Sequence, residues 1–140
     1  MLNRILRPAA PMAILPVRLV IGFAFLMHGW QKVFAFGFKG VTSYFVSLEI
    51  PGAGFWGVVI PLLELLGGIA ILLGFLTRYA AAALSVSMIV AILTVHLKAG
   101  FFPPKGYAYP LLFLGGSLAL LLAGPGPASL DRALGSEKSR

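Results

Sequence analysis

Residues 55–76 read FWGVVIPLLELLGGIAILLGFL, a run of 22 residues whose only charged side chain is Glu64. A helix needs about 20 predominantly apolar residues to cross the hydrocarbon layer of a bilayer. Three further segments of similar character, at about 13–34, 79–97 and 107–123, lie on either side of this run. The sequence therefore predicts four membrane-spanning helices.

The composition also indicates a membrane protein. Of the 140 residues, 59% are hydrophobic and 11% are charged, whereas an ordinary soluble domain is about 25% charged. A soluble bundle needs a polar stripe on each helix, but residues 106–130 contain no charged side chain. The chain has no cysteine, which excludes disulfides, thiol redox chemistry and cysteine-ligated zinc or iron–sulfur centres. We predict a single all-α domain over residues 1–140, a four-transmembrane-helix bundle.

Basic residues outnumber acidic ones by 11 to 4, which gives a net charge of +7. They lie singly between apolar runs and form no patch with exposed aromatic residues, so the predicted partner is the lipid bilayer and not nucleic acid. With four spans both termini lie on one side, and a bias of Lys and Arg toward that side predicts cytoplasmic termini. The terminal side has Arg4, Arg7, Arg18, Arg78, Arg132, Lys138 and Arg140, and the other side has Lys32, Lys39, Lys98 and Lys105.

The segments between and after the spans have their own signals. The connection at residues 35–54 is long enough to hold a short interfacial helix at 41–48, with aromatic residues at headgroup depth. The Gly-Pro run at 124–127 stops the fourth helix, and a polar tail follows over 127–140. Arg18 interrupts the first apolar run, so we expect an uncleaved span and not a signal peptide.

Small residues at helical spacing predict the faces through which the spans pack, because helices in lipid associate by close approach of their backbones. The predicted faces are Arg18, Gly22, Phe25, Gly29 and Lys32 in the first span, Gly57, Pro61, Glu64 and Gly68 in the second, Ala83, Ser87 and Ala91 in the third, and Gly115, Ala119 and Ala123 in the fourth. Together they favour a compact bundle.

Glu64 falls near the middle of the second span, where an unpaired carboxylate is costly. Helical rise places it about 9 Å in height from Arg18 and about 6 Å from His28. We expect Glu64 to be buried and hydrogen-bonded to one of these two residues, with Arg18 as the candidate for a structural ion pair. The residues alone leave open whether Glu64 is structural or functional.

His28, Lys32 and His96 lie at similar depth in the outer third of their spans. We predict that these three side chains and Glu64 border one polar pocket, because polar groups at one depth of a low-dielectric bundle cost less when they meet. The α-helical phase of His96 competes with this prediction, since it points away from the small residues of the third span, toward a partner or lipid headgroups. No metal site is predicted, because no pair of histidines has metal-ligand spacing.

Several motifs together resemble the DoxX family of small bacterial membrane proteins. The matching elements are Arg18-Leu19…Gly22, His28-Gly29-Trp30-Gln31-Lys32-Val33-Phe34, Glu64-Leu65-Leu66-Gly67-Gly68, Gly74-Phe75-Leu76-Thr77-Arg78, His96…Gly100-Phe101-Phe102 and Gly124-Pro125-Gly126…Ser129-Leu130-Asp131. The likeness covers roughly residues 12–132 in the right order. The family often has Gly-Tyr-Glu-Tyr-Pro at the start of the last span, where this chain has Ala108 in place of the acid, so a role for an acid at this position is not carried over.

The resemblance implies a four-helix protein of the bacterial inner membrane, linked to quinone-dependent oxidation in membrane oxidoreductase assemblies. Quinone is then the candidate cofactor. In this interpretation the catalytic set is His28, His96, Glu64 and Lys32, with the histidines as donors to the quinone oxygens and the other two as a proton route. The slot for the ring would be Phe25, Trp30, Phe34 and Phe101.

Two classes of function therefore stay open. The first is a quinone-interacting subunit that receives electrons from a membrane or soluble oxidoreductase partner or from a bound substrate. The second is a non-enzymatic scaffold or assembly protein, in which the polar cluster only holds the bundle together. A homo-oligomer is compatible with either class.

Overall fold

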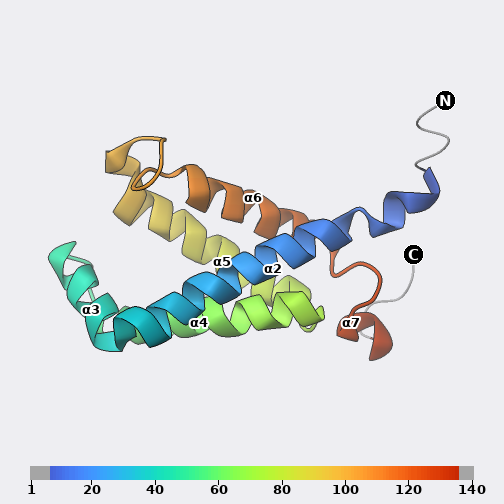
Figure 1. Ribbon diagram of the computed structural model, residues 1–140, viewed down its shortest axis with the longest axis horizontal. Coiled ribbons are helices and arrows are strands. Elements are labelled where there is room, and N and C mark those ends of the chain that lie inside the picture. The colour runs from blue at the N-terminus through green and yellow to red at the C-terminus, as the bar shows by residue number, and fades with distance from the viewer. Residues whose placement is uncertain (1–6, 136–140) are drawn as a thin grey trace.

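The computed structural model describes residues 7–135, and every regular element in this part of the chain is helical (Figure 1). Arg4, Lys138 and Arg140, which entered the charge count, lie outside the described residues. The elements are η1 (Arg7–Met12), α2 (Ile14–Trp30), η2 (Gln31–Phe36), α3 (Gly37–Ser47), α4 (Ala53–Leu73), α5 (Thr77–Ala91), η3 (Ile92–His96), η4 (Leu97–Ala99), α6 (Ala108–Ala123) and α7 (Leu130–Ala133).

Three helical stretches in the described part are long and apolar enough to cross a membrane: Ile14–Ser47, Ala53–Leu73 and Thr77–Ala99. The fourth predicted span corresponds to α6, an apolar helix of 16 residues. The all-α membrane bundle is thus confirmed, and the crossing of the membrane by α6 stays a prediction.

Helices α2 and α4 are antiparallel and pack through glycines. A Cβ atom at Gly29 would overlap the backbone of Leu65, and a Cβ atom at Gly68 would overlap the backbone of Leu26. The two backbones therefore touch at levels where only glycine fits. The face predicted for the second span is confirmed, since Gly57, Pro61, Glu64 and Gly68 are buried on α4. Of the face predicted for the first span, Arg18, Gly22, Phe25 and Gly29 are buried on α2, whereas Lys32 is only partly buried.

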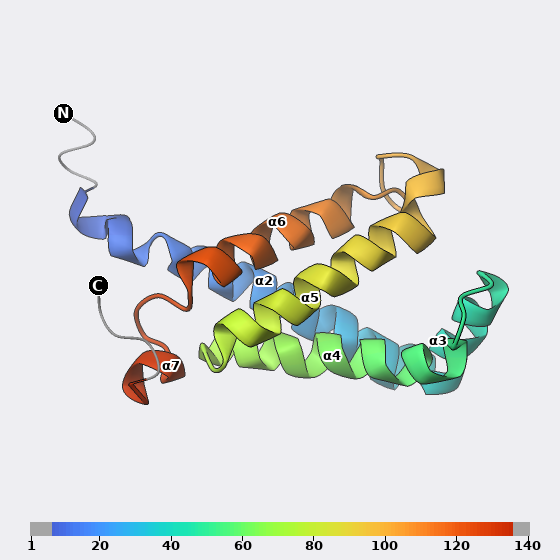
Figure 2. The ribbon, with the colours of Figure 1, turned by 180° about the vertical axis from the view of Figure 1, so that it is seen from behind.

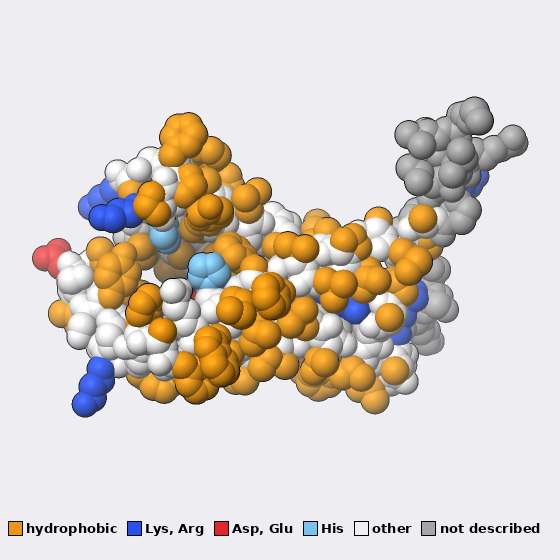
Figure 3. Space-filling view, viewed as in Figure 1, with side chains coloured by type: hydrophobic (Ala, Val, Ile, Leu, Met, Phe, Trp, Pro, Cys, Tyr) orange, Lys and Arg blue, Asp and Glu red, His pale blue; other side chains and the backbone are white. Residues whose placement is uncertain are grey.

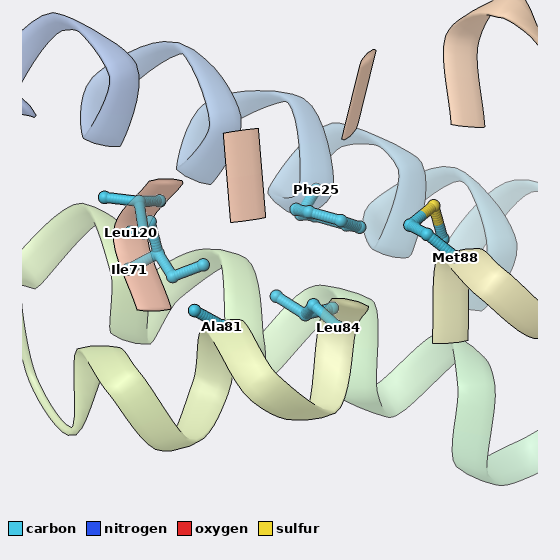
Figure 4. Close-up of a cluster of buried hydrophobic side chains, with 6 residues drawn as sticks. All are labelled: Phe25, Ile71, Ala81, Leu84, Met88 and Leu120. Atoms are coloured by element: carbon cyan, nitrogen blue, oxygen red, sulfur yellow. The ribbon is translucent and has the colours of Figure 1, made fainter. Parts of the chain in front are cut away.

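The hydrophobic core lies where α2, α4, α5 and α6 meet (Figure 4). Its members are Phe25, Ile71, Ala81, Leu84, Met88 and Leu120. Helix α6 contributes through Ser117 and Leu120, both fully buried. The face predicted for the fourth span is wrong, because a Cβ atom at Gly115 would meet nothing within 4 Å.

Helix α3 turns away from the axis of α2 at Gly37, whose φ of 70° favours glycine. It contains most of the short helix predicted at 41–48 and rises from the end of the α2–α4 pair, and the chain then returns to the start of α4 (Figure 1). Val41 is buried, and Thr42 lies directly against Gly57. We call this end of the bundle the α3 end.

The opposite end, which we call the α7 end, is closed by the segment that follows α6. The Arg18 guanidinium, 3% exposed, donates hydrogen bonds to the backbone carbonyls of Pro125, Pro127 and Ala128 at 2.5, 3.2 and 2.7 Å. A buried charge needs such partners, so Arg18 binds the C-terminal segment to α2.

Asp131 makes a second attachment at the α7 end. Its carboxylate accepts hydrogen bonds from the backbone N–H groups of Leu76 and Thr77 at 2.7 and 2.9 Å. Both groups lie at the start of α5, where backbone donors lack partners within the helix. The Asp131 N–H donates to the carbonyl of Gly74 at 2.8 Å, which fixes the segment on the α4–α5 turn.

The bundle opens toward the α3 end. In Figures 1 and 2, the α5–α6 pair diverges from the α2–α4 pair, so that the two pairs form the arms of a V. The core in Figure 4 lies nearer the closed part. The predicted polar residues lie where the arms separate.

Candidate functional site

A cavity of about 1000 Å³ lies between the two arms. The space-filling view in Figure 3 shows a hollow between two groups of hydrophobic side chains, with histidine on both sides of it. The lining is mostly apolar and comes from α2, α3, α4, α5 and α6. His28, Lys32, Glu64 and His96 all belong to this lining, so the structure brings the four predicted pocket residues to one cavity.

The strongest polar contact in the cavity is an ion pair. The Lys32 ammonium lies 2.6 Å from both carboxylate oxygens of Glu64. The Glu64 side chain is 3% exposed and the Lys32 side chain 27%, so the carboxylate is enclosed by protein while the ammonium borders the open space. An ammonium has three donors, and this placement leaves Lys32 able to meet a ligand as well as Glu64.

His28, in the last turn of α2, presents its ring to the cavity. The ring meets Phe113 of α6 edge-on, with 5.2 Å between ring centroids. Within the described part of the chain no hydrogen bond engages either ring nitrogen of His28. Both nitrogens are thus open to a ligand, one as donor and one as acceptor in the neutral ring.

His96 is oriented by a backbone contact. Its Nδ1 lies 2.8 Å from the carbonyl oxygen of Lys105. A carbonyl only accepts, so Nδ1 carries the proton and the neutral ring has its lone pair on Nε2. His96 can therefore accept a hydroxyl proton at Nε2, or donate there once it is protonated.

The direction predicted for the His96 side chain from α-helical spacing is wrong. Residues 92–96 form the π-helix η3, whose i→i+5 pattern returns His96 to the side of Ala91. His96 lines the cavity together with Ala83, Ser87 and Ala91, and does not point away from them. A second π-helix, η2, carries Lys32, and π segments often occur at functional sites.

The predicted partner of Glu64 was wrong. Arg18 binds the carbonyls at the α7 end, and Lys32 takes the place predicted for Arg18. The reason is the α2–α4 register, which sets Gly29 beside Glu64 and Leu65. Arg18 then lies eleven residues, or about 16 Å of helical rise, from the level of Glu64.

The aromatic slot is only partly where it was predicted. Phe25 lines the cavity, but Trp30, Phe34 and Phe101 do not. Trp30 and Phe34 stack on each other at 4.2 Å on the outer face of the helix, and Phe101 lies against Phe102 and Tyr107. Helical phase explains the first two, since they are one turn apart on a side of α2 and η2 different from the one that holds Gly29 and Lys32.

Other aromatic residues form the wall and were missed. They are Phe36, Tyr44, Phe45, Trp56, Tyr109 and Phe113. Two of them had a usable signal in the sequence: Trp56 is two helical turns before Glu64 on α4, and Phe113 follows Tyr109 by one turn on α6. Among the described residues, no three His, Cys, Asp or Glu side chains converge on a metal-sized site.

Comparison with known proteins gives the family. The chain matches the DoxX family over residues 13–97, which includes all four polar cavity residues. The chain belongs to the DoxX family. Ala108, where the family pattern often has an acid, opens α6 beside Tyr109 and does not line the cavity.

Some of the relatives that the chain matches are named as membrane proteins. The chain is 34% identical to "Uncharacterized membrane protein Rv3486" of Mycobacterium tuberculosis, over 94% of this chain and 86% of the relative. It is 35% identical to "Putative oxidoreductase CatD" of Bacillus subtilis, over 82% of this chain and 81% of the relative. It is 34% identical to "Inner membrane protein YqjF" of Escherichia coli, over 86% of this chain and 91% of the relative. No solved structure matches the chain.

Proposed function

We propose that this DoxX-family membrane protein is a quinone-interacting subunit of a membrane oxidoreductase system, and that the cavity between the arms binds the quinone ring. The observation that carries the proposal is a mostly apolar cavity of about 1000 Å³ whose lining includes the four polar side chains His28, Lys32, Glu64 and His96. A relative named as an oxidoreductase adds support. Relatives named as inner membrane proteins support the same localisation here.

The chemistry of the lining fits a quinone. The ring is flat and apolar, and Phe25, Trp56 and Phe113 offer apolar and aromatic surface to it. Its two carbonyl oxygens are hydrogen-bond acceptors. His28 and Lys32 are donors that face the cavity, and sites of this kind combine an apolar wall with a few convergent polar groups.

The same residues can handle the protons of quinone reduction. Forming a quinol takes two electrons and two protons, and the electrons come from a partner oxidoreductase in this proposal. Protons pass to the two oxygens through His28 and Lys32. Glu64 accepts hydrogen bonds from Lys32 and holds its ammonium at the cavity, and Lys32 takes its next proton from water after it has given one to the quinone. In the opposite reaction, the oxidation of a quinol, His96 can accept a hydroxyl proton at Nε2.

Tryptophan fluorescence provides a direct test of binding, because the chain has only two tryptophans and one of them, Trp56, lines the cavity. In a Trp30→Phe background, a tail-less benzoquinone should quench Trp56 to saturation in detergent or nanodiscs. His28→Leu should weaken this binding about tenfold, the loss of about one hydrogen bond to the ligand. Phe34→Leu, outside the cavity, is the matched control and should change it less than twofold.

Two results would overturn the proposal. One is quenching that rises linearly with quinone and never saturates, combined with the absence of quinone in the lipid extract of the purified protein by mass spectrometry. The other is equal binding by the His28 and Phe34 variants. Either result favours the scaffold alternative, in which the polar cluster is structural.

A further inference from the structure

A second hollow adjoins the cavity on the far side of His28. It has a volume of about 370 Å³ and is lined by Met27, His28, Trp30, Gln31 and Ala35. His28 and Ala35 line both hollows. The two hollows therefore lie next to each other, with His28 and Ala35 as their shared wall on one edge of α2 and η2.

The groove runs along the helix, the direction in which a lipid tail lies in a bilayer. It follows the helix from Ala35 back to Met27, eight residues or about 12 Å of helical rise, and so runs from the outer third of the span toward its middle. Met27 and Trp30 are 47% and 53% exposed on the outer face of the bundle. An apolar chain in this groove would lie between protein and bilayer with its inner end at the cavity.

Helix α6 is the neighbour of α2 beside His28. The His28 ring touches Phe113 of α6, so one of the two residues shared by the hollows lies at the contact between α2 and α6. The two helices diverge toward the α3 end (Figures 1 and 2).

We propose that the ligand of the cavity is a lipid-tailed quinone that enters sideways from the bilayer between α2 and α6. Its tail lies in the groove of Met27, Trp30, Gln31 and Ala35, and its ring passes His28 into the cavity. This inference rests on the proposed function and adds the class of quinone and its route. The observation that assigns the groove to the same ligand is that it shares His28 and Ala35 with the cavity, since a ligand without a tail would leave it unused.

The test compares two quinones that share one ring, a tail-less benzoquinone and its decyl-tailed analogue. Binding is measured by quenching of Trp56 in the Trp30→Phe background, which keeps an aromatic ring in the groove. Gln31→Phe fills the groove at a residue that does not line the cavity and should weaken binding of the decyl quinone about tenfold, while binding of the tail-less quinone changes less than twofold. Ala123→Phe, an exposed alanine of α6 that lines neither hollow, is the matched control and should change neither.

The outcomes separate the two proposals. If Gln31→Phe weakens both quinones equally, the groove does not discriminate the tail and is not a tail site. If it weakens neither, the ligand enters elsewhere. Both results overturn the tail site while the ring site stands. If the unsubstituted cavity binds neither quinone, the proposed function fails and this inference fails with it. Met27→Phe, on the same groove and also outside the cavity lining, repeats the comparison if Gln31→Phe does not fold.

Discussion

At the scale of single residues, the Lys32–Glu64 pair explains how a carboxylate can lie in the middle of an apolar helix. Glu64 is almost fully enclosed, and both its oxygens are engaged by one ammonium. Lys32 can reach it because the α2–α4 register places it one turn from the Glu64 level. Charged groups in a membrane bundle usually face inward and pair in this way.

We predict that Lys32→Met destabilises the protein more than the double variant Lys32→Met/Glu64→Leu. The single change leaves a buried carboxylate without its cation, whereas the double change leaves two apolar side chains of similar size. The expected coupling energy from a double-mutant cycle is about 1–3 kcal/mol. Thermal unfolding in one detergent, followed by circular dichroism, measures all four proteins of the cycle.

Lys39→Met, a substitution of an exposed lysine on α3, is the control for a lost positive charge and should leave the melting temperature nearly unchanged. A coupling energy near zero would show that Lys32 and Glu64 do not depend on each other.

The residue scale also shows what a sequence can and cannot reveal about the site. Depth along each span was enough to group His28, Lys32, Glu64 and His96, because helical rise is regular. It was not enough to pair Glu64 correctly, since pairing depends on the register between two helices. The hydrogen-bond partners of Arg18 are carbonyls more than 100 residues further along the chain, and no local sequence pattern predicts them.

At the scale of elements, glycines set the distance between α2 and α4. Gly29 lies against the backbone of Leu65, so there is no room there for even one methyl group. Gly115 on α6 faces open space instead. Glycine is therefore required for the helix contact at position 29 and is not required at position 115.

Gly29→Ala should destabilise the bundle by about 1–3 kcal/mol, the usual cost of adding a methyl group to a tightly packed interface. Gly115→Ala should be neutral or slightly stabilising, because alanine is the better helix former and nothing opposes its Cβ. Thermal unfolding of the two variants measures the difference. Equal melting temperatures would mean that α2 and α4 do not approach as closely as described.

The elements themselves were largely predictable, since apolar length defines a membrane helix and Gly-Pro runs end one. The short helix after the first span was also anticipated, and α3 occupies that place. The two π-helical segments were not, because no residue pattern in 31–36 or 92–96 distinguishes a π turn from an α turn. Their effect is large, since η3 decides which way His96 faces.

At the scale of the whole molecule, the two ends of the bundle differ in kind. The α7 end is closed by Arg18 and Asp131, which hold the C-terminal segment against α2 and the α4–α5 turn. The α3 end opens into the cavity (Figure 3). A bundle fixed at one end and open at the other can admit a ligand without losing its core. The sequence could not show this shape, because divergence of helices is a property of their packing.

The last prediction concerns the orientation of this bundle. Elements η1 and α7 lie at the same end (Figure 1), as expected if the chain crosses the membrane four times. Helix α6 is about 24 Å long by helical rise. The Arg78 side chain of α5 donates hydrogen bonds to the carbonyls of Leu121 and Leu122, near the C-terminus of α6. We therefore predict that α6 crosses the bilayer and that the α7 end is cytoplasmic.

The charge bias keeps its direction once the structure is taken into account. Arg18 is buried at the α7 end and Lys32 is paired inside the bundle. Without these two, six basic residues lie on the terminal side of the sequence-based topology and three on the other, and basic residues favour the cytoplasm.

Paired phosphatase and fluorescent-protein fusions at Gly40, Arg78, Lys105 and Arg140 measure the topology. Fusions at Arg78 and Arg140 should report the cytoplasm, and fusions at Gly40 and Lys105 the outside. A cytoplasmic Arg78 with an external Arg140 would show that α6 does not cross, and external reporters at both would reverse the whole bundle, placing the open cavity at the cytoplasmic face.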